Sequence, residues 1–137
     1  MDRINIKYNE YSQKMLEQLD KGVFLTTKVN EKVNTMTIAW GGINVVWNKK
    51  VFVAYVRYTR ETYKMLEEAN EFTINVPLDK DLRKELGFCG TKSGRDYDKI
   101  KETKPDYVII FPWNLKDEIS KQLAFIHDWG GKFVVAV

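Results

Sequence analysis

The segment from residue 22 to residue 40 constrains the fold more than any other part of the 137-residue chain. It reads GVFLTTKV, then NEK, then VNTMTIAW, so two runs rich in β-branched and aromatic residues flank a short polar turn. Such runs favour strands, and the short turn between them predicts an antiparallel hairpin. The glycines at 41 and 42 are expected to end this run. The next apolar run, VFVAYV at 51–56, is typical of a strand buried on both faces.

Three helices are expected around these strands. Apolar side chains at helical spacing predict a helix over residues 8–19. Thr59 is expected to cap a second helix that runs to about Ala69, and Asp79 to cap a third after the strand EFTINV. Residues 20–76 are therefore expected to form an antiparallel barrel with inserted helices.

The composition changes near residue 104. PDYVIIFPW at 105–113 predicts a buried strand, and Asn114 is expected to cap a helix with an apolar stripe. The glycines at 130 and 131 are a strong helix stop, and KFVVAV at 132–137 predicts a last strand. The end of the chain therefore reads as strand, helix, strand.

Composition also limits the classes of function. The 22 basic and 19 acidic residues leave a net charge of +3 with no basic block of the kind that marks a nucleic-acid arm. A single cysteine, Cys89, and a single histidine, His127, argue against an intrachain disulfide and against most metal and triad chemistry. Because no apolar run resembles a leader or a membrane span, we expect a cytoplasmic protein without nucleic-acid or membrane partners.

Three stretches fit one known pattern. They are VNTMTIAWGG on a strand, VRYTRETYKML from a strand into a helix, and FCGTKSGRDYDK in a loop. In this order and spacing, residues 4–102 resemble the flavin reductase-like family, the FMN-binding split barrels that include flavoredoxin. The resemblance implies an α+β fold with an antiparallel split β-barrel, incomplete because other sequence stands where the family's later strands would follow. It also implies an FMN cofactor, NAD(P)H as electron donor and a homodimer.

The sequence from Pro105 onward is similar to another family. It resembles the C-terminal region of S-adenosylmethionine-dependent C-methyltransferases, a Rossmann-like strand–helix–strand piece. We therefore expect two segments, residues 1–103 and 104–137, packed into one globule, with a strand of the second segment pairing with the open barrel edge. A natural fusion, an engineered chimera and an artefact of the sequence record would all give this pattern. No methyl transfer is assigned to the second segment.

The loop GTKSGRD at residues 90–96 has the chemistry of a phosphate site. Glycines let backbone N–H groups approach a phosphate, and lysine and arginine supply positive charge. The resemblance points to the same loop as the site of the FMN phosphate. The expected contacts are Lys92, Ser93, Gly94 and Arg95. The alternative is a solvated turn in which Arg95 pairs with Asp96 or Asp98.

A second group of residues is expected to contact the phosphate or the ribityl chain of FMN. A strand end that opens into a helix N-terminus is a natural place for phosphate. The resemblance implies Thr59 and Thr62 there, with Arg57 behind them. The alternative for Thr59 is helix capping, and Arg60 is expected to be a solvated surface residue.

A third group is expected beside the flavin ring. Asn34 and Trp40 lie six residues apart on one expected strand, so they should face the same side of the sheet. The resemblance places such a pair beside the isoalloxazine, where the backbone of Thr35 and Met36 would serve its pyrimidine edge. The alternative is a core tryptophan and a strand-end asparagine.

These expectations describe an FMN-binding protein of the flavin reductase type, which transfers hydride from NAD(P)H to flavin. No side-chain acid or nucleophile is required, because the flavin carries the chemistry. The alternatives are a flavin-binding module without turnover, and a chimeric or fusion chain that folds but has no catalytic activity. The expected partners are flavin, nicotinamide and a second copy of the chain.

Overall fold

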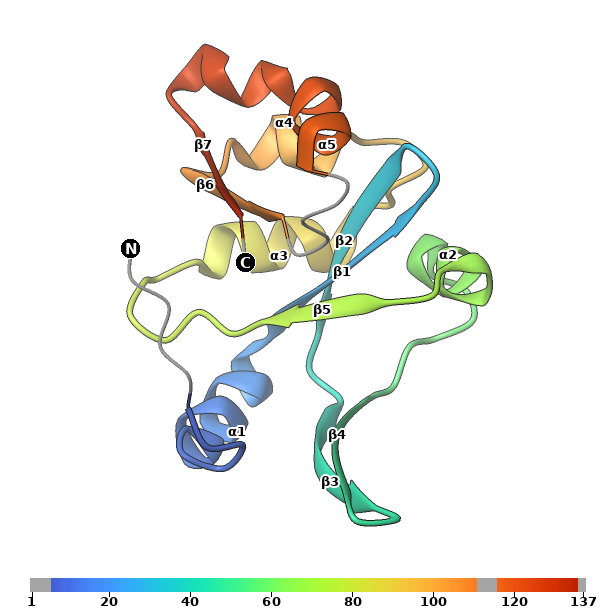
Figure 1. Ribbon diagram of the computed structural model, residues 1–137, viewed down its shortest axis with the longest axis vertical. Coiled ribbons are helices and arrows are strands. Elements are labelled where there is room, and N and C mark those ends of the chain that lie inside the picture. Colours follow the sequence, from blue (N-terminus) through green and yellow to red (C-terminus); the bar gives the residue numbers. More distant parts are fainter. Residues whose placement is uncertain (1–5, 111–115, 136–137) are drawn as a thin grey trace. The chain divides into compact units, whose positions relative to one another are not determined.

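The computed structural model describes residues 6–110 and 116–135 and divides the chain into two compact units (Figure 1). One unit lies within residues 5–97, and the other includes the residues from 98 onward. The fold is mixed α+β, as the sequence predicts. Each unit is described by itself below.

The predicted hairpin is present at the centre of the first unit. Helix α1 (Ser12–Lys21) leads into strand β1 (Val23–Val29), which pairs antiparallel with β2 (Lys32–Ile38). Asn30 takes a left-handed φ of 50° in the two-residue loop, a conformation that asparagine tolerates better than most residues. Strand β5 (Phe72–Asn75) pairs with the other side of β1, which gives the sheet order β2-β1-β5.

The core of this unit follows the two-residue period of the strands. Val23 and Leu25 of β1 are fully buried, and Met36 and Ile38 of β2 are buried opposite them. Leu19 of α1 joins this cluster. The burial of alternate apolar residues fixes the register, because a one-residue slip would turn all of them toward solvent.

Contrary to the prediction, the glycines at 41 and 42 do not mark a break in strand structure. They begin strand β3 (Gly41–Val46), which forms a second hairpin with β4 (Lys49–Ala54). Trp47 and Asn48 have φ values of 45° and 60°, the positive values that a type I′ turn requires. The sequence prediction missed β3 because it took the two glycines for a break.

Helices α2 (Glu61–Glu68) and α3 (Arg83–Thr91) pack against the three-stranded sheet, α2 mainly on β1 and α3 on β2. Both start later than predicted. Arg60 rather than Thr59 occupies the N-cap of α2, without a side-chain cap bond. Leu82 rather than Asp79 precedes α3, which also extends into the predicted loop through Thr91. The sequence favoured good capping residues, but the observed N-caps lie one and three residues later and make no side-chain cap bond.

The strands of this unit form antiparallel sheets that are not closed into a barrel in the part of the chain that the structure describes. The β2-β1-β5 sheet and the β3–β4 hairpin are separate sheets, and Figure 1 shows the hairpin extending away from β1 and β5. Residues Phe52 and Ala54 of β4 still pack on the central core, so the base of the hairpin is anchored.

The second unit is the predicted strand–helix–strand arrangement. Its elements are α4 (Lys99–Thr103), β6 (Tyr107–Ile110), α5 (Lys116–Gln122), the 3-10 helix η2 (Ala124–Trp129) and β7 (Lys132–Val135). The Asp98 side chain caps α4 by accepting a hydrogen bond from the Lys101 backbone N–H. The predicted cap Asn114 lies outside the described residues.

Strands β6 and β7 pair with each other in parallel. Among the described residues neither strand joins the sheet of the first unit, so the predicted pairing is not found within one chain. Pairing with the sheet of a dimer partner stays a prediction. Ile119, Leu123 and Ile126 are buried together, as their spacing predicts. None of the described helices has the length and apolar character that crossing a bilayer would need.

Candidate functional site

A cavity of about 270 Å³ lies in the first unit, where β2 ends and the chain leaves β4. The run Met36–Trp40 forms one side, and Tyr55 and Arg57 form another. Arg60 at the start of α2 and Gly90 in the last turn of α3 complete the lining. Backbone hydrogen bonding between Tyr55 N and Trp40 O (3.0 Å) holds two of these walls together.

The mouth of the cavity combines aromatic and cationic side chains. Trp40 and Tyr55 are 57% and 65% exposed, although tryptophan is usually among the more buried residues. The guanidinium carbon of Arg57 lies 5.1 Å from the centroid of the Trp40 ring, within the range of a cation–π contact. Exposed rings and guanidinium groups together suit a ligand that is both planar and anionic.

Arg60 is held in place at the cavity. Its guanidinium donates a hydrogen bond to the carbonyl of Gly90, at the carboxyl end of α3. The last carbonyls of a helix carry a partial negative charge, which favours a cation there. The sequence predicted a solvated Arg60, but this side chain is half-buried and fixed by a residue 30 positions away.

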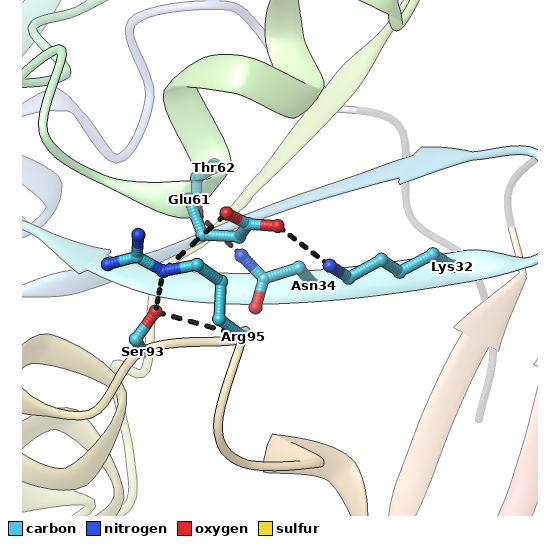
Figure 2. A network of polar contacts seen from close by, with 6 residues as sticks. All are labelled: Lys32, Asn34, Glu61, Thr62, Ser93 and Arg95. Atoms are coloured by element: carbon cyan, nitrogen blue, oxygen red, sulfur yellow. Dashed lines mark hydrogen bonds and ion pairs between the residues drawn. The ribbon is translucent and has the colours of Figure 1, made fainter.

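A second group of polar residues forms a network beside the start of α2 (Figure 2). The Asn34 side-chain amide of β2 donates to the Thr62 hydroxyl at 2.7 Å, and both side chains are at least 96% buried (4% and 1% exposed). Gly94 of the following loop lies directly against the Asn34 side chain, where a Cβ atom would meet the Asn34 oxygen. Strand, helix and loop therefore meet at one buried hydrogen bond.

Glu61 forms the ionic part of this network. Figure 2 shows its carboxylate between the Lys32 ammonium, 2.7 Å away, and Arg95, whose Nε lies at 3.9 Å. Hydrogen bonding to Lys32 is the main cause that lowers the pKa of Glu61, burial opposes it, and the charges of Arg95 and Lys64 add to it. A lowered pKa means that these pairs stabilise the fold above the ordinary glutamate value of 4.5 and are lost as the pH falls through the lower folded value.

The expected site residues fall into separate groups. Those that line the cavity are Met36, Trp40 and Arg57. Those that meet in the network are Asn34, Thr62, Ser93, Gly94 and Arg95. Those in neither group are Thr35, Thr59 and Lys92. The Thr35 hydroxyl donates a hydrogen bond to the Leu25 carbonyl, and Thr59 is exposed. The Lys92 ammonium lies 5.3 Å from the Tyr97 ring centroid.

Contrary to the prediction, Asn34 and Trp40 do not lie on the same face of one strand. Strand β2 ends at Ile38, so the two-residue alternation does not carry through to Trp40. The Asn34 side chain is buried against Thr62, while Trp40 is exposed at the cavity mouth.

The sequence prediction missed Tyr55 and Arg60 at the cavity, and Lys32 and Glu61 in the network. Tyr55 was hidden inside an apolar run that reads as a buried strand. Glu61 in the RETY motif at 60–63 carried a signal, since a carboxylate is favoured in the first turn of a helix. The expected alternative pairing of Arg95 with Asp96 or Asp98 is replaced by its contact with Glu61.

Comparison with known proteins gives one match. Residues 92–137 match the model of the C-methyltransferase C-terminal domain family. This supports the methyltransferase-like character of the C-terminal part, and the match also takes in the loop from Lys92 to Arg95. No curated protein and no solved structure matches the chain. The resemblance of residues 4–102 to the flavin reductase-like family receives no support from these comparisons.

Proposed function

We propose that the first unit binds FMN at the cavity between the end of β2 and the start of α2. The observation that carries this proposal is the combination of two exposed rings, Trp40 and Tyr55, with two guanidinium groups, Arg57 and Arg60, around one cavity. The rings would pack against the isoalloxazine, and the guanidinium groups would bind the phosphate.

The residues present fit this cofactor in part. The cavity of about 270 Å³ is slightly below the range of roughly 300–1,000 Å³ that is usual for cofactor sites. It would therefore enclose one end of FMN, with exposed Trp40 and Tyr55 meeting the remainder. The loop Lys92–Arg95 is the alternative proposed phosphate contact, through Lys92, Ser93, Gly94 and Arg95, although these residues do not line the cavity. Met36 lines the cavity and keeps its proposed role beside the flavin ring. Asn34 and Thr62 are buried and bond to each other, and Thr35 and Thr59 do not line the cavity, so no FMN contact is proposed for these four residues.

When bound, FMN would supply the redox chemistry by accepting hydride from NAD(P)H, which gives the flavin reductase activity that we propose. The chain's own side chains would bind and orient the cofactor. Arg60 suits this role because its bond to the Gly90 carbonyl fixes the guanidinium before a ligand arrives. A flavin-binding module without turnover would need the same residues.

The arginines give the direct test of this proposal. Replacing Arg57 and Arg60 together by alanine in the full chain should weaken FMN at least tenfold in an equilibrium titration, because hydrogen bonds to a charged group contribute about 1.5–3 kcal/mol each. Riboflavin has no phosphate, so its affinity should change much less. Equal losses for the two ligands would show that the arginines act on the fold rather than on the phosphate.

A second candidate is a chimeric or fusion chain that folds but has no catalytic activity. The match of residues 92–137 to a methyltransferase family, together with the two compact units, favours it. The same titration separates the two proposals, because a chimeric chain without activity should show no saturable FMN binding. NAD(P)H oxidation in the presence of FMN then separates a reductase from a binding module.

We also propose that the protein is a cytoplasmic homodimer. The tip of the β3–β4 hairpin supports self-association, because Val45, Val46 and Trp47 are all exposed and Trp47 is 93% exposed. Strand β3 pairs with β4 alone among the described strands, so one edge of β3 is open to pairing.

A further inference from the structure

We infer that Glu61 is a positioning residue, which holds the loop Ser93–Arg95 against β2 and α2 and keeps the neighbouring Arg60 directed at the cavity. The effect of Glu61 on the loop is independent of any ligand. The effect on Arg60 rests on the proposed function, since it concerns the binding of the FMN phosphate.

The geometry of the carboxylate supports this role. Its two oxygens have different partners, because Oε1 pairs with Lys32 of β2 and Oε2 faces Arg95 of the loop. The Glu61 side chain is 13% exposed, whereas those of Lys32 and Arg95 are 50% and 57% exposed. The carboxylate is thus the shielded centre of the cluster, and Lys64 adds a further positive charge from α2. Two ion pairs of this carboxylate thus join α2 to β2 and to the loop.

Contacts close to Glu61 also join β2, α2 and the loop. Asn34 of β2 bonds to Thr62 of α2, and Gly94 of the loop lies against Asn34. The loop also has a local contact, because the Ser93 hydroxyl accepts hydrogen bonds from the Arg95 backbone N–H (3.2 Å) and from Nε (3.3 Å). This contact presents the Arg95 guanidinium to Glu61. Two sets of contacts therefore hold the loop. The first is buried and uncharged and consists of the packing of Gly94 against Asn34. The second is ionic and partly exposed, with Glu61 as its anion.

The link to the cavity runs through the adjacent residue. Arg60 precedes Glu61 at the start of α2, and its guanidinium holds the Gly90 carbonyl. The Arg60–Gly90 bond and the Glu61–Arg95 pair therefore hold the two ends of one short segment, residues 90–95. Loss of the Glu61 charge should loosen both ends of this stretch, and with them the alignment of Arg60.

Hydrogen exchange in the full chain without ligand tests the loop. The substitution Glu61→Gln keeps the shape of the side chain and removes the charge. We expect the amides of residues 93–97 to exchange about two- to fivefold faster, the range that corresponds to a partly exposed ion pair of 0.3–1 kcal/mol. Glu61→Asp, which keeps the charge, should restore most of the protection. Exchange in Glu61→Gln that equals the wild type would overturn the inference.

Asp81→Asn is the matched control. Asp81 pairs with Arg83 at 2.7 Å, both side chains are exposed, and neither belongs to the cavity or the network. This substitution should leave the amides of residues 93–97 unchanged. If Glu61→Gln does not fold, Arg95→Gln removes the same ion pair from its exposed side and should give the same faster exchange. Unchanged exchange in that variant would also overturn the inference.

Titration with FMN tests the proposed effect of Glu61 on Arg60. If the wild type binds FMN, Glu61→Gln should weaken it by a similar factor of about two to five and leave riboflavin nearly unchanged. Faster exchange with unchanged FMN affinity would overturn the positioning of Arg60 while the role in the loop stands. A wild type that does not bind FMN would refute the proposed function, and the exchange experiment would still decide the role of Glu61 in the loop.

Discussion

Gly94 lies directly against the buried side chain of Asn34. In the sequence it reads as a flexible loop glycine that lets backbone approach a phosphate. In the structure its missing Cβ makes room for the buried Asn34 side chain, which would otherwise collide with it. The glycine therefore serves close packing between the loop and β2.

The substitution Gly94→Ala tests this packing role. The added methyl group must displace Asn34 or the loop, so we expect a loss of about 1–3 kcal/mol in the free energy of unfolding. Gly87→Ala is the control, because nothing lies near its Cβ position and it sits inside α3. That change should be neutral or raise stability by up to about 1 kcal/mol. Equal effects in urea titrations would contradict the packing role of Gly94.

At the scale of elements, the β3–β4 hairpin depends on its turn. Asn48 occupies the second left-handed position with a φ of 60°. Type I′ turns favour glycine there, because a side chain costs energy at positive φ. The runs on either side, GGINVV and KKVFVA, supply the β-branched residues of the two strands.

Two substitutions at this turn should have opposite effects. Asn48→Gly should raise the free energy of unfolding by about 0.5–1 kcal/mol, because glycine suits the turn without strain. Asn48→Val should lower it by about 1–2 kcal/mol, because a β-branched residue is strained at positive φ. Thermal unfolding gives both values. A destabilised Asn48→Gly variant would mean that the turn differs from the type I′ geometry.

The elements that the sequence predicts well are those with strong local patterns. The hairpin of β1 and β2 follows from two β-branched runs, and the stripe of Ile119, Leu123 and Ile126 follows from helical spacing. Helix starts were predicted less well, since Arg60 and Leu82 replace the better capping residues nearby. Neither N-cap makes a side-chain cap bond, so capping chemistry in the sequence does not mark these helix starts.

At the scale of the whole molecule, the candidate site was harder to predict than the fold. The Asn34–Thr62 bond joins residues 28 positions apart, and Arg60 meets Gly90 across 30 positions. Such pairs depend on how helices are placed on the sheet, which periodicity does not reveal. The residues that the sequence analysis assigned to one FMN site lie in two groups, one at the cavity and one in the network.

The proposed homodimer can be tested through the open edge of β3. Full-length wild type should scatter light as a dimer, and Val45→Lys should shift it toward the monomer because a lysine on an edge strand opposes pairing. Leu16→Lys is the control, since it replaces a similarly exposed apolar residue on α1 and should leave the dimer intact. A monomeric wild type, or a dimeric Val45→Lys variant, would contradict pairing through this edge.

The most direct test of FMN binding is the tryptophan fluorescence of the full chain during titration with FMN, corrected for FMN absorbance with free tryptophan. Trp40 lines the cavity, whereas Trp47 lies at the exposed tip of the β3–β4 hairpin. We predict saturable quenching that is largely lost in Trp40→Phe and kept in Trp47→Phe. Absence of saturable quenching in the wild type, or unchanged quenching in Trp40→Phe, would contradict FMN binding at this cavity.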